Sequence, residues 1–568
     1  MNFEPMLFLN RKIFKLNIFY AMLITGSITS ISLLACVPPV SRDALTHHLY
    51  IPKLYLQHGG IYEIPYLIVS YYPMNLDLLY LIPLYFKNDN IPAFIHFSFA
   101  LITAAMLYRY LVRRINMTYA LLGVLFFLTI PIIVRLSSTA YVDLGLICFF
   151  FASILCLFEW IESGFKARYL IFSAIYCGLA MGTKYNGLIG FFLLSLFVIF
   201  VYARYHTGQK RYVAKAGGWF AVFVITALII FSPWLIRNMA WTGNPVYPLY
   251  NTHFKTSETT LKTKPEIEFE THMDISQIRV LREIYGESWL QVALIPFRVF
   301  FQGQDDNPRY FDGRTNPFLL LLPLFAFLGL RLGTRQEKTE KLLLLLFSVF
   351  FLLYACIQSA IRIRYFSAIL PPLVVLSMYG LYNFQTQILT PSSFLSEFIK
   401  KAVVSGIILF MLGLNTIYFV SRFKLDQPID FIFGNLTRDE YIQAYRPEYA
   451  AYQYANAHIG NDSKILGVYL GNRGYYLDRH IEFSIELLKD LAQKAQTGRY
   501  IMEKLHEKGF THLLVNSHLL NSWAQKYSTH DQKMLRHFFE FYTIPEFSKD
   551  GCTLFRFKTQ TAAIFLQD

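Results

Sequence analysis

The sequence predicts a polytopic α-helical membrane protein that carries a small α/β domain at its C-terminal end. Of its 568 residues, 54% are hydrophobic and only 16% are charged, whereas an average soluble chain carries about 25% charged residues. Apolar runs of about 20 residues recur along the chain, and this length crosses a hydrocarbon core of about 30 Å. After about residue 422 charges rise and turn residues appear, which indicates a domain outside the membrane.

About eleven transmembrane helices are expected within residues 1–421. The first apolar run follows the basic residues Arg11, Lys12 and Lys15 and extends to Val40. It is long, lacks a small-x-small cleavage site and leads into further membrane segments, so we interpret it as an uncleaved helix and not as a signal peptide. The other helices are expected at about 91–112, 118–136, 139–161, 169–184, 187–204, 217–236, 316–332, 341–358, 363–383 and 402–421.

The distribution of Lys and Arg predicts the orientation of the chain. One set of alternate connections is rich in both residues, and the positive-inside rule places this set and the N-terminus in the cytoplasm. This set holds Arg109, Arg113, Arg114, Lys166, Arg168, Arg204, Lys210, Arg211, Lys215, Arg331, Arg335, Lys338, Lys341, Lys400 and Lys401. It accounts for much of the net charge of +14 without a nucleic-acid partner. The expected location is the cell inner membrane, crossed many times.

Three long segments then face the outside, together with short turns near 136–140, 184–187 and 358–363. The first outside loop, residues 41–90, is too polar to lie in lipid and too aromatic for a loose linker, and short interfacial helices are expected near 43–58 and 74–86. The long outside loop, residues 237–315, should begin with a mobile charged part and continue with an amphipathic part at 278–301 that lies on the membrane. The charged part holds Lys255, Lys262, Lys264, Glu266, Glu268, Glu270 and Asp274.

The third outside segment, residues 422–568, alternates strand and helix patterns. Strands are expected at 465–471 and 511–517, and helices at 446–460 and 486–498, which together predict a small α/β domain. Gly471 and Gly474 follow the first strand, but the GNRG spacing does not match the GxGxxG nucleotide loop. A structural turn is the expected role of these glycines.

The outside loops hold the residues that are candidates for chemistry. Asp43 stands at the exit of the first helix, where a carboxylate can accept a proton from an acceptor group; the alternative is a polar stop paired with Arg42. His47 lies four residues further on, so it would share a helical face with Asp43. His47 and His48 are either metal ligands or interfacial hydrogen-bonding groups. Asp143 begins an apolar run, where an ionisable group is a functional candidate by default.

Four cations lie at outward helix ends, against the positive-inside trend: Lys184, Arg237, Arg362 and Arg364. Guanidinium groups bind phosphate oxygens in a bidentate manner, so a lipid-linked phosphate at this leaflet is a natural partner. Snorkelling to the headgroups is the alternative for any one of them. Snorkelling explains less well why four cations and two carboxylates lie on the same face.

These motifs together resemble the GT-C superfamily of membrane glycosyltransferases, which includes protein O-mannosyltransferases and the lipid A aminoarabinose transferase. The resemblance covers about residues 1–421. It is carried by Asp43 after the first helix, then by GIY (60–62), YYPMN (71–75), AYVD (140–143), GTKYNGL (182–188), PWLIRN with TGNP (233–245) and RYFSAILP (364–371).

The resemblance implies a donor sugar linked to polyprenyl phosphate and an acceptor that is a glycolipid, a glycan or a protein. It implies that Asp43 is the general base, or the acid that orients the acceptor, of an inverting displacement. Asp143, in the AYVD motif, is the second catalytic candidate. The implied substrate- and phosphate-binding residues are Lys184, Tyr185, Arg237, Asn238, Arg362, Arg364 and Tyr365.

The chain departs from this family in two places. Many relatives carry Asp-Glu after the first helix, whereas this chain has Asp43-Ala44; where relatives often carry Glu in the Tyr-Pro segment, it has Asn75 and Asp77. Whether the protein binds a divalent cation, with His47 and His48 as candidate ligands, therefore stays open.

Three other functions compete with a glycosyltransferase. A flippase or transporter of lipid-linked glycans would bury ionisable groups near the bilayer midplane and often shows internal repeats; here the charged candidates lie at one edge and no repeat is found. An oligosaccharide ligase or polymerase shares the donor chemistry and the orientation. A membrane scaffold would bind partners through residues 422–568.

Overall fold

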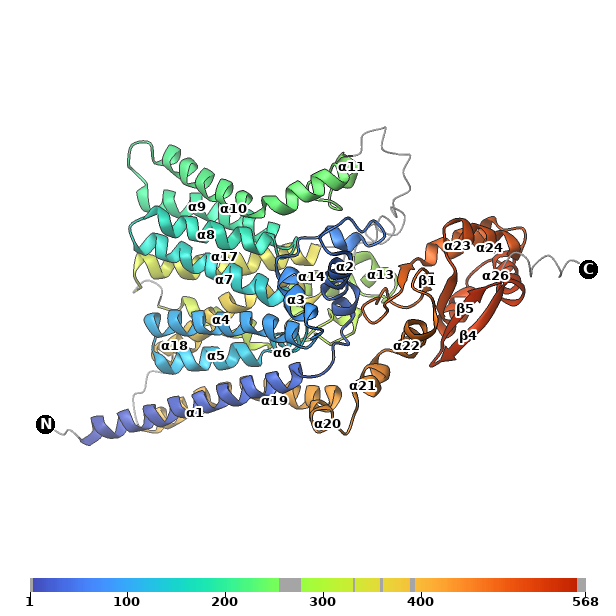
Figure 1. Ribbon diagram of the computed structural model, residues 1–568. Coiled ribbons are helices and arrows are strands. Elements are labelled where there is room, and N and C mark those ends of the chain that lie inside the picture. The colour runs from blue at the N-terminus through green and yellow to red at the C-terminus, as the bar shows by residue number, and fades with distance from the viewer. Residues whose placement is uncertain (1–3, 255–276, 330–332, 358–360, 389–393, 559–568) are drawn as a thin grey trace, which may run out of the picture.

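A computed structural model describes residues 4–254, 277–329, 333–357, 361–388 and 394–558. Helices form a bundle, and the C-terminal domain lies at one end of it (Figure 1). The N-terminal end of α1 (Glu4–Ala35) lies at the opposite end of this bundle. The helices α2, α3 and α6 lie at the end that faces the C-terminal domain.

Within the described ranges, eight segments are long and apolar enough to cross a membrane, so the chain is a multi-pass membrane protein. A ninth span is formed if α5 (Met117–Thr129) and α6 (Pro131–Ser137), which meet at 65°, count as one. Pro131 begins α6 and removes a helical N–H donor at this bend. The eight segments lie on α1, α4 (Ile91–Arg114), α7 (Asp143–Glu162), α9 (Gly187–His206), α10 (Tyr212–Thr242), α17 (Arg335–Ile357), η7 (Ile363–Ile369) with α18 (Leu370–Asn383) and η8 (Phe384–Ile388), and α19 (Phe394–Asp426).

The predicted number of about eleven spans is higher than this count, although all eleven expected segments are helical. Two of them are short. α8 (Ala167–Met181) has 15 residues and is about 22 Å long. The segment expected at 316–332 forms α16 (Phe318–Leu321) and the 3-10 helix η5 (Leu322–Phe327), since Pro323 interrupts regular α-helical hydrogen bonding there.

The first outside loop contains helices at both predicted places. Asp43 immediately precedes a π-helix, η1 (Ala44–His48), and α2 (Tyr50–His58) follows it directly. The 3-10 helix η2 (Ile68–Tyr71) leads to α3 (Asn75–Tyr85). Gly145 of α7 permits close packing of α3, because a Cβ there would lie 2.3 Å from a methyl carbon of Leu76. That these helices lie in the membrane interface stays a prediction.

The long outside loop is described in part. Its predicted mobile start, which includes the seven charged residues named above, lies outside the described residues. Before it lies α11 (Asn251–Phe254); the predicted amphipathic part forms α13 (Gln277–Glu283), α14 (Trp289–Ala293) and α15 (Ile295–Arg298), followed by η4 (Pro308–Tyr310). Gly286, in the connection that follows α13, has a φ of 67°, which a glycine adopts with little strain.

The C-terminal domain contains a five-stranded sheet in the order β2-β1-β3-β5-β4. β1 (Lys464–Val468) pairs in parallel with β2 (His480–Phe483) and β3 (His512–Asn516), whereas β5 (Cys552–Phe557) pairs antiparallel with β3 and with β4 (Thr543–Lys549). The predicted strands are β1 and β3, and the predicted helices are α22 (Tyr449–His458) and α23 (Ile485–Lys494). The other helices are α20 (Pro428–Ile432), α21 (Arg438–Tyr445), α24 (Gly498–Glu507), α25 (Ser517–Ala524) and α26 (Thr529–Tyr542).

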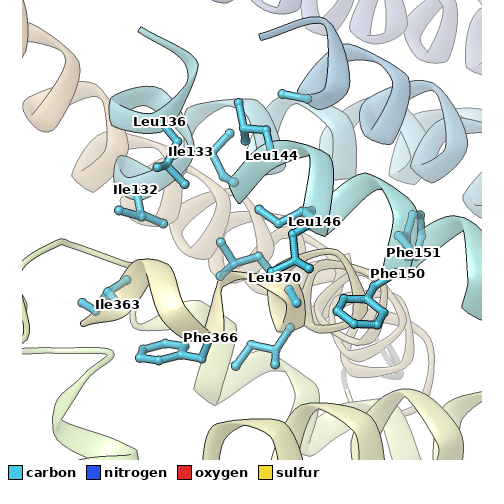
Figure 2. Close-up of a cluster of buried hydrophobic side chains, with 14 of the residues drawn as sticks. Ile132, Ile133, Leu136, Leu144, Leu146, Phe150, Phe151, Ile363, Phe366 and Leu370 are labelled. Carbon is cyan, nitrogen blue, oxygen red and sulfur yellow. The ribbon is translucent and has the colours of Figure 1, made fainter. Parts of the chain in front are cut away.

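An apolar core lies where α6, α7, η7 and α18 meet (Figure 2). α7 begins with Asp143, and η7 contains Arg364. Burial of these side chains therefore determines where both charged residues lie. The labelled core residues are Ile132, Ile133, Leu136, Leu144, Leu146, Phe150, Phe151, Ile363, Phe366 and Leu370.

Candidate functional site

Two buried ion pairs lie where the first outside loop meets the helix ends. The guanidinium of Arg364 donates a hydrogen bond to the Asp43 carboxylate. Lys184 Nζ lies 2.7 Å from Asp143 Oδ1. The Asp143 side chain is fully buried, and that of Arg364 is 8% exposed. Charges this deeply buried are tolerated when they are paired, and the pairing joins four residues predicted to be functional.

The start of α7 is held in place by His96 of α4. His96 Nε2 accepts a hydrogen bond of 2.8 Å from the Leu144 backbone N–H, and its Nδ1 donates to the carbonyl oxygens of Leu136 and Thr139, both at 2.9 Å. The first N–H groups of a helix have no partner within the helix, so His96 satisfies one of them. The Asp143 carboxylate lies at the same terminus, where the helix dipole favours a negative charge.

A third buried pair lies within the first outside loop. His48 Nδ1 lies 2.7 Å from Asp77 Oδ1, and both side chains are less than 7% exposed. His47 Nδ1 contacts the Thr46 hydroxyl at 2.9 Å. The residues that follow Asp43, 44–48, form a π-helix. In the described part of the chain, no group of three or more His, Cys, Asp or Glu is arranged to hold a metal ion.

The charges of the site shift the pKa values of the loop residues. Burial opposes ionisation of Asp43, but the Arg364 guanidinium outweighs it and holds the pKa of Asp43 well below its usual range. Burial lowers the pKa of His48 to about 3 and raises the pKa of Asp77 to about 7. Asp43 is therefore ionised at neutral pH, while burial favours the uncharged forms of the His48–Asp77 pair.

Aromatic rings cover the cations of the site. The Arg364 guanidinium lies 5.1 Å from the ring centroid of Tyr141 and 5.3 Å from that of Tyr365. Lys184 Nζ lies 5.1 Å from the Tyr365 centroid. Arg362 also lies over this ring, at 5.8 Å, and its guanidinium is 3.7 Å from Asp312. Tyr365 thus contacts three of the four predicted cations.

Two buried polar atoms of the ion pairs remain without a hydrogen-bond partner among the described residues: Asp143 Oδ2 and Arg364 Nε. Most buried polar atoms in folded proteins are hydrogen-bonded, and an exception needs an explanation. One of these atoms is an acceptor and the other is a donor. The site therefore retains hydrogen-bonding capacity for a polar ligand.

The fourth cation, Arg237, belongs to a second cluster. Its guanidinium donates to the carbonyl oxygens of Tyr71 and Tyr72 at 2.6 and 3.1 Å. It lies between the rings of Trp234 and Trp241, with its Cζ 4.6 and 4.9 Å from their centroids.

Two further predicted residues lie in this second cluster. Asn238 Nδ2 donates to the Tyr185 hydroxyl at 3.0 Å and to the Tyr71 carbonyl at 2.9 Å. Tyr72 contacts Tyr185, with ring centroids 5.5 Å apart. Burial raises the pKa of Tyr72. Arg237, Asn238 and Tyr185 thus hold the backbone that leads from η2 into α3.

The structure therefore divides the predicted residues between two adjoining clusters. Asp43, Asp143, Lys184, Arg364 and Tyr365 lie together, with Arg362 at their border. Sequence reasoning missed His96, Tyr141 and the pairing of His48 with Asp77. A signal for His96 was present, because an ionisable residue inside an apolar helix is a functional candidate by default. Tyr141 lies within the AYVD motif, of which only Asp143 was singled out, and no sequence pattern marks the pairing of His48 with Asp77.

Comparison with known proteins gives matches to the family and to the fold. The family model described as dolichyl-phosphate-mannose-protein mannosyltransferase matches residues 84–236. These residues include Asp143 and Lys184 but not Asp43 or Arg364. No curated protein sequence matches the chain.

Solved structures match over nearly the whole chain. ArnT from Cupriavidus metallidurans, bound to undecaprenyl phosphate, is similar with a TM-score of 0.55 and 11% identity, covering 94% of this chain and 97% of that one. The archaeal oligosaccharyltransferase AglB from Archaeoglobus fulgidus, in complex with an inhibitory peptide and a dolichol phosphate, is similar with a TM-score of 0.51 and 11% identity. This match covers 96% of this chain and 74% of that one.

These matches show that the chain has the GT-C fold, in which membrane-spanning helices are followed by a domain outside the bundle. The predicted resemblance to GT-C membrane glycosyltransferases is thereby confirmed at the level of the fold.

Proposed function

We propose that the protein is a glycosyltransferase that moves a sugar from a polyprenyl-phosphate carrier to an acceptor at the membrane surface. The observation that carries this proposal is the convergence of two buried carboxylate–cation pairs, Asp43–Arg364 and Asp143–Lys184, in a GT-C fold. The match to an ArnT structure that is bound to undecaprenyl phosphate supports a lipid-linked donor. The acceptor is a glycolipid, a glycan or a protein.

The reaction is an inverting displacement at the anomeric carbon. The acceptor O–H or N–H group attacks this carbon, the bond from carbon to the phosphate oxygen breaks, and the electron pair of that bond stays on the leaving phosphate. The proton of the acceptor passes to the Asp43 carboxylate. Cations held in place before the reaction stabilise the charge that develops on the phosphate, which is often the largest catalytic contribution. Arg364 and Lys184 supply these cations.

Binding of the donor also changes the state of Asp43. In the structure Arg364 is paired with Asp43, which keeps this carboxylate a weak base. A phosphate that engages Arg364 competes with Asp43 for the guanidinium, so Asp43 becomes more basic when the donor arrives. Asp143 holds Lys184 in the orientation that faces the phosphate.

The remaining predicted residues complete the donor site. Tyr365 packs against Lys184, Arg362 and Arg364 and orients them. Arg237 retains one buried guanidinium nitrogen, Nη1, without a partner among the described residues. We assign this nitrogen, supported by Asn238 and Tyr185, to an oxygen of the donor. Transfer occurs on the extracytoplasmic face of the inner membrane, and the N-terminus is cytoplasmic.

Replacement of Asp43 tests the proposal. We expect Asp43→Asn to lower transfer by about 10²–10⁴-fold, because base catalysis contributes that much. The assay measures polyprenyl phosphate released from undecaprenyl-phosphate-linked glucose, mannose or aminoarabinose in proteoliposomes. Asp462→Asn, which changes an exposed carboxylate of the C-terminal domain, is the matched control. Near-normal turnover by Asp43→Asn contradicts the role of Asp43, and no release by the wild-type protein from any donor contradicts the function.

Transfer of an oligosaccharide is the second candidate, favoured by the match to the oligosaccharyltransferase AglB over 96% of the chain. The same assay separates the two functions when it is repeated with an oligosaccharide-linked carrier. A flippase moves the intact donor across the bilayer and releases no polyprenyl phosphate.

A further inference from the structure

The C-terminal domain contacts the first outside loop at several places, which include an Arg438–Asp89 ion pair and a ring contact of His480 with Tyr66. One short segment, residues 473–478, binds the loop beside Asp43, and we name it the docking turn. Side chains of α22, in the same domain, form hydrogen bonds with the docking turn. The Tyr452 hydroxyl donates to the Arg473 carbonyl at 2.8 Å, and Asn456 Nδ2 donates to the Tyr476 carbonyl at 3.0 Å. The Asp478 N–H donates back to Asn456 Oδ1 at 2.8 Å. The docking turn is thus fixed to its own domain.

Lys53 of α2 binds the opposite side of the docking turn. Its Nζ donates to the carbonyl oxygens of Tyr475 and Leu477 at 2.7 and 2.8 Å, and to the Asp478 carboxylate at 2.8 Å. A lysine ammonium has three donors, and all three are used here. The Lys53 side chain is 18% exposed, so a largely buried charge joins the two parts of the chain.

The docking turn also contacts the π-helix that follows Asp43. The Tyr475 N–H donates to the Leu45 carbonyl at 3.2 Å, within η1 itself. Nearby, the Tyr476 hydroxyl donates to the Pro39 carbonyl at 2.8 Å, and Arg446 donates to the Val40 carbonyl. The backbone on both sides of Asp43 is therefore hydrogen-bonded to the C-terminal domain.

Gly474 makes this close approach possible. A Cβ at this position would lie 2.4 Å from a ring carbon of Tyr50, in the first turn of α2, which is shorter than real Cβ contacts. A glycine is therefore required for the turn to lie against the ring. The sequence GNRG, which has the wrong spacing for a nucleotide loop, thus has a structural reason for its second glycine.

We propose that Lys53 and the docking turn form a clamp through which the C-terminal domain positions Asp43 for transfer. The inference rests on the proposed function. Lys53 is a positioning residue, because it acts through η1 and does not touch the reacting atoms. A displacement of about 1 Å at a reacting group costs about 10²-fold in rate, so a clamp on the segment that carries Asp43 affects turnover more than donor binding.

Two variants disrupt the clamp from opposite sides. Lys53→Met removes the three hydrogen bonds, and Gly474→Ala forces the docking turn away from Tyr50. Lys464→Met is the matched control, because Lys464 likewise binds a carboxylate, Glu482 at 2.8 Å, and a backbone carbonyl, Lys508 at 3.2 Å, within the C-terminal domain. All variants are studied as the full chain in nanodiscs.

Hydrogen exchange tests the clamp without reference to activity. The N–H groups of Leu45 and Leu49 donate to the carbonyls of Ser41 and Ala44 in the wild-type protein. We expect their protection to fall at least tenfold in Lys53→Met and Gly474→Ala, with unchanged protection in β3, which reports that the C-terminal domain is folded. Unchanged protection of residues 44–49 in both variants overturns the clamp, whatever the activity of the protein.

Steady-state kinetics with the lipid-linked sugars used for Asp43→Asn test the consequence. We expect kcat to fall about 10–100-fold in both clamp variants, with KM for the donor changed less than twofold and Lys464→Met unchanged. Reduced hydrogen-exchange protection of residues 44–49 together with a normal kcat overturns the positioning role of Lys53. An inactive wild-type protein contradicts the proposed function instead, and the exchange result then still decides whether the clamp exists.

Discussion

At the scale of single residues, the site consists of charges that are stable only in pairs. Asp143 is fully buried, and Lys184 is its partner at 2.7 Å. Removal of one member of a buried pair leaves an uncompensated charge, which typically costs about 3–5 kcal/mol. Replacement of both members by neutral groups costs much less, since no buried charge remains.

This difference predicts a strong coupling between Lys184 and Asp143. We expect Lys184→Gln to lower the stability of the protein by about 3 kcal/mol, and Lys184→Gln with Asp143→Asn to recover most of this loss without recovering activity. Thermal unfolding in detergent measures the stability, and release of polyprenyl phosphate measures the activity. Additive effects of the two substitutions on stability would contradict the pairing.

The His48–Asp77 pair predicts a dependence of stability on pH. The pKa of Asp77 is raised to about 7, so its stabilising contribution is lost as the pH rises from about 4 to 7; the pKa of His48 is lowered to about 3, so its contribution is lost as the pH falls from about 6.5 to 3. The two contributions oppose each other between pH 4 and 6.5. We therefore expect Asp77→Asn, in which only His48 titrates, to lose stability below pH 6.5 relative to the wild-type protein.

The unfolding temperatures of both proteins at pH 7, 5.5 and 4.5 measure this loss. The difference between the two proteins is the relevant quantity, because all other titrating groups are shared. Asp462→Asn should follow the wild-type profile. Parallel profiles of Asp77→Asn and the wild-type protein would refute the expected opposition of the two groups.

At the scale of elements, helix termini carry most of the site. Asp143 begins α7, and Arg364 lies in η7, the 3-10 turn that leads into α18. A helix end leaves backbone groups without partners, and in this chain side chains from other elements satisfy them. His96 accepts a hydrogen bond from the Leu144 N–H at the start of α7, and the docking turn donates one to the Leu45 carbonyl of η1.

The cap on α7 gives a prediction for His96. We expect His96→Ala to leave the Leu144 N–H unsatisfied in a buried place, at a cost of about 1–3 kcal/mol, while the carbonyls of Leu136 and Thr139 keep their backbone donors. Transfer should fall as well, because the same terminus positions Asp143. Thermal unfolding and the release assay measure the two effects. Stability equal to that of the wild-type protein would show that this cap contributes nothing.

At the scale of the whole molecule, α2 and α3 of the first outside loop lie at the end of the helical bundle that faces the C-terminal domain (Figure 1). Lys and Arg concentrate in connections between the helices, and the positive-inside rule assigns those connections to the cytoplasm. In the proposed topology the first outside loop and the C-terminal domain lie on the opposite side, which is where the proposed lipid-linked donor and external acceptor would meet.

Labelling of single introduced cysteines tests this orientation. Asn461 lies in an exposed turn of the C-terminal domain, and Gln209 lies in an exposed connection between α9 and α10. We expect a membrane-impermeant maleimide to label Asn461→Cys on intact spheroplasts of a bacterial host and to label Gln209→Cys only after permeabilisation, with the unsubstituted protein as background. The reverse pattern would invert the proposed topology.

Much of the fold follows from local patterns. All eleven predicted membrane segments are helical, and the strands at β1 and β3 lie where apolar runs predicted them. A backbone in lipid must satisfy its own hydrogen bonds, so a long apolar run specifies a helix without knowledge of its neighbours. Local patterns predicted the lengths less well. Two features account for the difference in the number of spans. Pro323 interrupts the α-helix in the segment expected at 316–332, and α8 is short.

The sequence by itself determined the membrane class, the segments of the bundle and the small α/β domain, and it predicted that Asp43, Asp143 and the four cations share one face. Only the tertiary structure decided which of these charges pair, that Arg237 lies in a separate cluster, and that Lys53 joins the docking turn. The physical reason is sequence separation: Asp43 and Arg364 are 321 residues apart, and Lys53 and Asp478 are 425 apart. Apolar periodicity acts over a few turns of helix, whereas ion pairs form only after the bundle has brought distant helix ends together.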